Sequence, residues 1–112
     1  MCSSDLDLPI AFCDARSVDT DDVVAFPVKD YAGGGFDFEA LGVMGRHIDQ
    51  HKWYAFPNLS QDEVVVFRTY DSDRVGTEQP FWTPHAAFRD PEVPLGQPSR
   101  SSMEMRATCL FL

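Results

Sequence analysis

The feature that most constrains the fold is a series of short apolar or alternating segments separated by turn-forming residues. Each segment has the length of a strand, is rich in β-branched and aromatic residues, and is bounded by Asp, Gly, Pro, Asn or Ser. No window of helical length shows a regular 3.6-residue apolar period. The chain is therefore predicted to be mostly β. The expected strands are residues 8–13, 23–28, 36–43, 52–56, 63–70, 79–88 and 102–112.

The connections between these segments favour an antiparallel sheet, since a parallel sheet would need intervening helices. A sandwich, jelly roll or barrel follows. Three glycines at 33–35 make the most flexible connection, and a stiff loop with three prolines covers 89–100. One helical turn is expected near residues 17–22, capped by Ser17 or Asp19. With 112 residues the chain makes one small domain, 1–112, and its strand-like ends predict that it is a piece of a larger protein.

Composition excludes several classes of function. The formal net charge is -9 and the nine basic residues are scattered, which argues against a nucleic-acid partner. No apolar run approaches the roughly 20 residues needed to span a bilayer. The first ten residues lack the basic and apolar regions of a signal peptide, so a cytoplasmic protein is expected. The cysteines are odd in number and have no Cys-x-x-Cys spacing, which predicts reduced thiols. The three cysteines are Cys2, Cys13 and Cys109, and we expect Cys13 and Cys109 to be core residues.

A histidine followed by an alternating polar segment is the first candidate site. His85 lies between aromatic residues, where a structural role is more usual than a ligand role. In residues 100–107, alternation places Arg100, Ser102, Glu104 and Arg106 on one face. If that face lines a barrel, its guanidinium and hydroxyl groups form an anion pocket. The equally plausible alternative is a solvent-facing strand with a Glu104–Arg106 charge pair.

Three weaker patterns offer other chemistry. His47 and Asp49 form a His-x-Asp pair, the compact part of a 2-His-1-carboxylate iron site, although a solvated turn is the more frequent explanation of this pair. Acidic residues on either side of 63–70 are expected to cap the ends of a strand in water, since a Ca²⁺ loop would need more ligands. A Ser-His-Asp set lacks a nucleophile elbow. The residues in the last two patterns are Asp62, Glu63, Asp71 and Asp73, and Ser101 or Ser102 with His85 and Asp90.

Four segments, in order, resemble a known family. They read LPIAFCDARSVD, HKWYAFPNLSQDEVVVFRTYDSD, PHAAFRDP and RSSMEMRATCLF, and they extend over nearly the whole chain. This pattern resembles the fungal AsaB-type hydroxylase/desaturases, which are related to the cephamycin methoxylase CmcJ and to gibberellin desaturase. The resemblance implies a double-stranded β-helix and a non-haem Fe(II)- and 2-oxoglutarate-dependent oxygenase that acts on a small secondary metabolite.

The resemblance also implies roles for individual residues. His85 corresponds to the distal iron-binding histidine, Arg100 with Ser102 to the pair that holds the 2-oxoglutarate carboxylate, and Arg106 to a second basic residue of the pocket. The family's His-x-Asp pair lies upstream of LPIAFCDARSVD, so His47 and Asp49 are interpreted as a coincidence. The chain is thus expected to be a C-terminal part that keeps one of three iron ligands.

Two other hypotheses remain open from the sequence. The first is a metal-free jelly-roll module that binds a small ligand or a partner, with Trp53, Trp82 and Phe88 lining a cleft. The second is that His47, Asp49 and His85 assemble a metal site within this chain.

Overall fold

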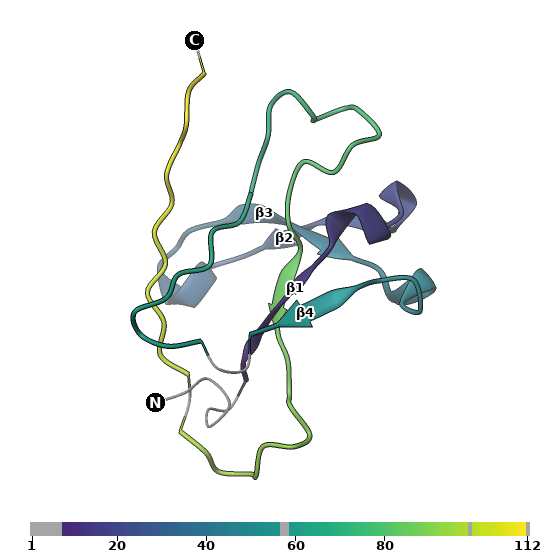
Figure 1. The fold of residues 1–112 in the computed structure, drawn as a ribbon. Helices are drawn as coiled ribbons and strands as arrows, with labels where there is room; N and C mark the ends of the chain where they lie inside the picture. Colours follow the sequence, from purple (N-terminus) through teal and green to yellow (C-terminus); the bar gives the residue numbers. More distant parts are fainter. Residues whose placement is uncertain (1–7, 57–58, 99, 112) are drawn as a thin grey trace.

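A computed structural model describes residues 8–56, 59–98 and 100–111 (Figure 1). The mostly β prediction is confirmed: the described residues form antiparallel sheets and contain no α-helix. The strands are β1 (Ile10–Cys13), β2 (Val23–Val28), β3 (Phe38–Val43), β4 (Trp53–Ala55) and β5 (His85–Ala87). Each lies inside a segment that the sequence predicts as a strand.

The centre of the fold is a three-stranded antiparallel sheet in the order β4-β1-β5. Phe12 of β1 stands opposite Tyr54 on one side and His85 on the other. Two backbone hydrogen bonds extend the pairing at the end of β1. One runs from Cys13 N to the Pro84 carbonyl (2.8 Å) and the other from Asp14 N to the Lys52 carbonyl (2.9 Å). The chain brings together segments some 70 residues apart. On their shared strand β1, Ala11, Phe12 and Cys13 are buried, each exposed by 9% or less; among the described residues, the neighbouring Pro9 and Pro84 are buried as well.

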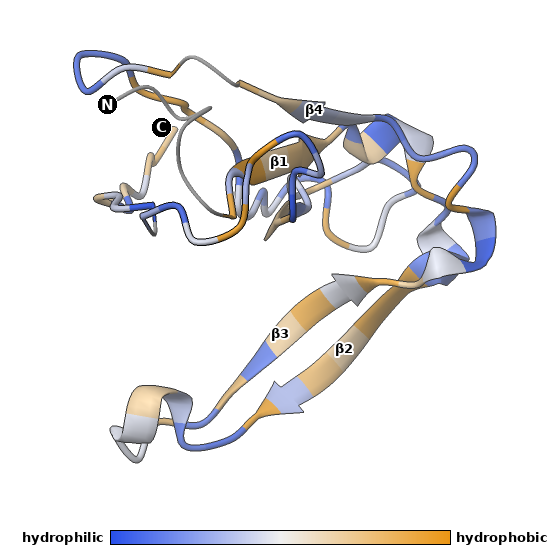
Figure 2. Cartoon of the chain, turned by 90° about the horizontal axis from the view of Figure 1, so that it is seen from below, coloured by the Kyte–Doolittle hydropathy of each residue, from blue (hydrophilic) through white to orange (hydrophobic). Residues whose placement is uncertain are grey.

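Strands β2 and β3 form a separate antiparallel hairpin, which projects away from the three-stranded sheet (Figure 2). Val23 pairs with Val43 at its base and Val28 with Phe38 at its tip. The tip contains the short turn η4 (Tyr31–Gly33), where Gly33 has φ +71° and Gly35 φ +68°. These positive φ values account for two of the three glycines in the run, since residues with a Cβ rarely adopt them. The predicted flexible connection is thus a hairpin turn.

Short 3₁₀ turns connect the two sheets: η2 (Ala15–Ser17), η3 (Thr20–Asp22) and η5 (Gly45–His47). The Asp19 side chain caps η3 by accepting a hydrogen bond from the Asp21 amide at 3.0 Å, which confirms the predicted capped turn. Ser17 is not the cap of this turn, because its hydroxyl donates to the Asp14 carbonyl at 2.6 Å.

Two predicted strands are wrong. Neither the described part of 63–70 nor that of 102–112 is a strand. In residues 63–70, Val64 and Val66 are 85% and 91% exposed. A backbone hydrogen bond from Thr83 N to the Arg68 carbonyl, at 2.8 Å, links these residues to the segment that precedes β5. Residues 101–111 are exposed throughout. Strand propensity needs a paired ladder to become a strand, and these segments do not obtain one within the described residues.

Cys13 is buried as expected, whereas Cys109 is exposed, so its predicted core role is wrong. Cys109 is exposed because residues 101–111 do not pair with or pack on a sheet among the described residues. Cys2 lies outside the described residues.

Across the described residues, we find no helix with the length and apolar character needed to cross a membrane.

Candidate functional site

His85 lies at the start of β5, on the edge of an aromatic cluster. Its ring centroid is 4.7 Å from that of Phe67 and 6.1 Å from that of Phe12, whose rings lie 4.9 Å apart. Nδ1 is 3.0 Å from the Thr83 carbonyl oxygen. A carbonyl can only accept, so Nδ1 carries the hydrogen and Nε2 has its lone pair available. The bond to Thr83 fixes the orientation of the ring, and the His85 side chain is exposed.

The aromatic cluster forms the floor of an open cleft of about 460 Å³. Trp82 lines this cleft as predicted, but Trp53 and Phe88 are not among its lining residues. Trp53 lies on β4 and is 41% exposed. The apolar lining comes from β1, from the chain just after β4, and from the segments before and after the loop at 71–79. The lining side chains are Phe12, Cys13, Ala15, Phe56, Val65, Val66, Phe67, Pro80 and Trp82, with Asp14, Arg68, Arg74 and Thr83 as the polar ones.

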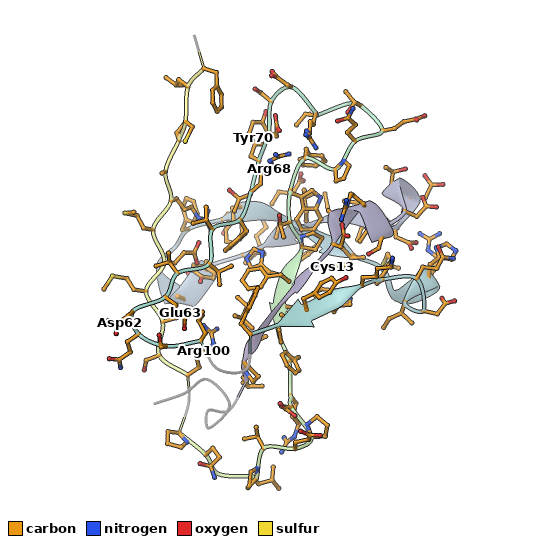
Figure 3. The ribbon with its side chains drawn as sticks, viewed as in Figure 1. Cys13, Asp62, Glu63, Arg68, Tyr70 and Arg100 are labelled. Atoms are coloured by element: carbon orange, nitrogen blue, oxygen red, sulfur yellow. The ribbon has the colours of Figure 1, made fainter. Side chains whose placement is uncertain are left out.

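The predicted anion-binding residues do not line the cleft described above. The half-buried Arg100 donates from Nε to the Leu8 carbonyl at 3.3 Å. Ser102 is exposed, and Arg106 pairs with Glu104 at 3.1 Å while remaining 80% exposed. The expected Glu104–Arg106 charge pair is therefore present. The strand that would turn these residues to one face is absent, because residues 101–111 have no ladder partner among those described. In Figure 3, Arg100 lies well below Arg68.

His47 belongs to a polar cluster around Asp22, at the base of the β2–β3 hairpin. The Asp22 side chain is fully buried, with Oδ2 2.8 Å from His47 Nδ1 and 3.7 Å from His51 Nε2. Arg46 Nε lies 3.4 Å from Oδ1. The cluster joins η3 to η5 and to the chain entering β4, together with a bond from Met44 N to the Asp22 carbonyl at 2.7 Å. It is a charge-compensated anchor of the hairpin.

Within the described residues, no three His, Cys, Asp or Glu side chains are placed to hold a metal ion together. The structure thus does not bring His47, Asp49 and His85 into one site. Nor does it form a Ser-His-Asp arrangement: His85 Nδ1 contacts Thr83, the Asp90 carboxylate accepts from the Glu92 amide at 2.9 Å, and the serines at 101–102 are exposed.

The acidic groups near the cleft cap turns and bind arginines. Glu63 accepts a hydrogen bond from the Ser60 amide at 2.9 Å, which lowers its pKa. One oxygen of Asp71, Oδ2, is 3.0 Å from Arg68 and 3.3 Å from Arg74. Glu63 is exposed as expected, but it caps a turn and not a strand end, because residues 63–70 form no strand. The Asp71 side chain is three-quarters buried between two guanidiniums.

Two groups beside β1 have shifted pKa values. Burial raises the pKa of the Cys13 thiol, which keeps it protonated and unreactive. Hydrogen bonds from the Arg16 side chain, at 2.9 and 2.7 Å, lower the pKa of Asp14 from 3.8 to about 2. The Asp14–Arg16 pair is solvent-exposed on the arginine side and belongs to the CDARSVD segment.

An NMR titration of the Asp14 carboxyl carbon is expected to give a midpoint near 2. The lowered pKa means that the pair favours the folded state above pH 3.8 and that this contribution disappears as the pH falls toward 2. Arg16→Gln is expected to move the midpoint upward toward 3.8. Lys29→Gln, which removes the partner of Asp37 instead, should leave Asp14 unchanged. A midpoint that ignores Arg16→Gln would show that the pair does not persist in solution.

The comparisons with known proteins decide the family. A family model described as an oxidoreductase/YMDC permease-like domain matches residues 5–110. The chain belongs to this oxidoreductase family. The resemblance to AsaB-type hydroxylase/desaturases is confirmed as well, by curated fungal relatives that match over most of the chain. No solved structure matches.

Three relatives show how far the match extends. Hydroxylase/desaturase efuI of Hormonema carpetanum is 33% identical over 88% of this chain and 34% of its own length. Fe(II)/2-oxoglutarate-dependent dioxygenase nvfI of Aspergillus novofumigatus is 32% identical over 90% and 34%. Hydroxylase/desaturase asaB of Aspergillus flavus is 29% identical over 92% and 48%. The chain thus spans between a third and a half of the length of these three relatives.

Sequence reasoning missed the Asp22 cluster and the two arginines of the cleft. Asp22 stands in an acidic run, 19–22, whose other members gave no sign that one carboxylate is buried. The i,i+4 spacing of His47 and His51 was the available signal. Arg68 and Arg74 flank Asp71 at three residues on either side, a spacing that favours pairing.

Proposed function

We propose that this chain is part of an Fe(II)- and 2-oxoglutarate-dependent hydroxylase or desaturase that acts on a small secondary metabolite. The observation that carries the proposal is the match of the relatives over about nine-tenths of the chain, since one of them is named as a dioxygenase of this type. The antiparallel strands are compatible with a jelly roll, of which these residues would supply a C-terminal part.

His85 is the proposed iron ligand in this chain. Its Nδ1–H bond to the Thr83 carbonyl leaves Nε2 for a metal. A 2-His-1-carboxylate site needs two further ligands, and the described residues do not supply them beside His85. The described residues therefore do not form a complete iron site, and we propose that the other ligands come from sequence outside the described residues.

Arg100 and Ser102 are the proposed anchors of the 2-oxoglutarate carboxylate, with Arg106 as a second basic group. Arg100 uses Nε for the Leu8 carbonyl, so its two terminal amino groups remain to form a fork with a carboxylate. Ser102 follows two positions later and Arg106 four positions after that. For Arg100 and Ser102 to face one carboxylate from the same side, residues 100–102 would have to pair as a strand.

The test is an anaerobic addition of Fe(II) and 2-oxoglutarate, followed by the weak visible charge-transfer band. A longer polypeptide that includes the sequence encoded upstream of Met1 is expected to show the band, and the 112-residue chain alone is not. His85→Ala in the longer polypeptide should remove it, whereas His47→Ala, which removes the Asp22 partner instead, should keep it. A longer polypeptide without the band, or one that keeps it after His85→Ala, would contradict the proposal.

A metal-free ligand-binding module is the second candidate function. The cleft lined by Phe12, Phe67 and Trp82 favours it, because apolar clefts with a few polar groups are the usual form of small-molecule sites. Saturable binding by the cleft, with no band in the longer polypeptide, would select this function over the oxygenase.

A further inference from the structure

The cleft next to His85 combines an aromatic floor with cationic groups. The Phe12 and Phe67 rings are 4.9 Å apart, and Phe56 lies 6.1 Å from Phe12. Arg68 and Arg74 line the same cleft, and Cys13 lines it from β1. Arg68 and Cys13 are labelled in Figure 3. A flat apolar group can lie on such a floor, while a polar group at its end reaches the arginines.

The charges around the cleft leave one positive charge in excess. Arg68 and Arg74 share one carboxylate, Asp71, and both contact the same oxygen, Oδ2. Asp14, the carboxylate that lines the cleft, is already paired with Arg16 at 2.7 Å. Of the charged residues that line the cleft, two are guanidiniums, Arg68 and Arg74, and one is a carboxylate, Asp14. In a chain whose net charge is -9, this is a local reversal of sign, and it favours an anion at this place.

The arginines also have hydrogen-bond donors to offer. Arg68 uses NH1, and Arg74 uses Nε, for the same Asp71 oxygen, while Arg74 makes a long 3.5 Å contact from NH1 to the Pro80 carbonyl. Both side chains are about 40% exposed. Ion pairs at such positions are weak, so a ligand carboxylate can bind a guanidinium fork without a large loss elsewhere.

We infer that this cleft binds a small apolar or aromatic carboxylate, with its ring on Phe12, Phe67 and Trp82 and its carboxylate on Arg68 and Arg74. The inference goes beyond the proposed oxygenase function and does not depend on iron. Under the oxygenase proposal, the cleft would hold the substrate beside His85, since the His85 ring contacts Phe12 and Phe67. Its test is made without metal, so its failure leaves the oxygenase proposal standing.

The experiment titrates the ¹⁵N-labelled 112-residue chain with phenylacetate and with its neutral analogue phenylacetamide. The reporter is the indole N–H of Trp82, assigned with the Trp53→Phe variant. We expect saturable shifts at Trp82, with phenylacetate binding about tenfold more tightly than phenylacetamide, a difference that corresponds to one charge-assisted hydrogen bond. The Trp53 signal, from outside the cleft, should not follow the titration.

Matched variants test the role of the arginines. Arg74→Gln should reduce the preference for phenylacetate over phenylacetamide to about twofold or less, whereas Arg89→Gln, the same charge change outside the cleft lining, should preserve it. Circular dichroism of each variant confirms that the fold is retained. Equal affinities for acid and amide, or an equal effect of the two substitutions, would overturn the inference. Shifts at both tryptophans without saturation would indicate nonspecific association and would also overturn it.

Discussion

Replacing Asp22 by Ala is expected to lower the free energy of unfolding by about 3 kcal/mol, because it removes one partner of a buried charge cluster. The Asp22 side chain is fully buried and the His51 side chain is 3% exposed. Without the carboxylate, His47 and Arg46 can turn to solvent, since they are about half exposed. His51 cannot, because its side chain is only 3% exposed, and it is left facing the space that the carboxylate vacates. Urea unfolding followed by circular dichroism gives the number.

Asp21→Ala is the matched control. Asp21 is the neighbouring residue, it is exposed, and it contributes its backbone carbonyl to Arg46 at 3.1 Å. A substitution on such a surface changes the free energy of unfolding by about 0.5 kcal/mol or less. If Asp21→Ala and Asp22→Ala destabilise the chain equally, the cluster does not anchor the hairpin.

The sequence predicted the strands that pair and failed for those that do not. Strands β1, β2, β3, β4 and β5 all lie within expected segments, because β-branched and aromatic runs bounded by turn residues mark local preference well. Residues 63–70 carry the same signal with the sequence VVVF at their centre. Their strand did not form, since pairing depends on which neighbour is present and not on the segment itself. Local patterns contain no information on that neighbour.

The candidate site shows the same division between local and long-range information. The position of His85 on a strand follows from nearby sequence and is found, whereas its ring contacts, Phe12 and Phe67, come from segments that are distant in sequence. The cleft beside it joins β1 to the chain near 65–68 and 80–83, which are distant in sequence. Its two arginines were consequently not predicted, although Arg68 stands within a segment that carries the family resemblance.

Replacing Phe12 by Ala is expected to cost about 4 kcal/mol, the usual range for truncating a buried aromatic residue. Phe12 is 9% exposed, lies on the central strand, and has ring contacts with Phe56, Phe67 and His85. Folded domains are stabilised by only about 5–15 kcal/mol in total, so the variant is expected to unfold at a much lower urea concentration than the parent chain. Loss of the Phe12 ring would also remove part of the cleft lining.

Phe12→Leu keeps the test informative if the Ala variant does not fold, because a volume change of this size between apolar residues costs about 1–2 kcal/mol. Phe111→Ala is the control, since that ring is 96% exposed, and it should change the free energy of unfolding by about 0.5 kcal/mol or less. The order Phe12→Ala, Phe12→Leu, Phe111→Ala in decreasing cost is what a core centred on β1 requires. A Phe111 variant as unstable as the Phe12 variants would mean that the tail at 101–111 packs in solution. The core would then extend beyond the β4-β1-β5 sheet.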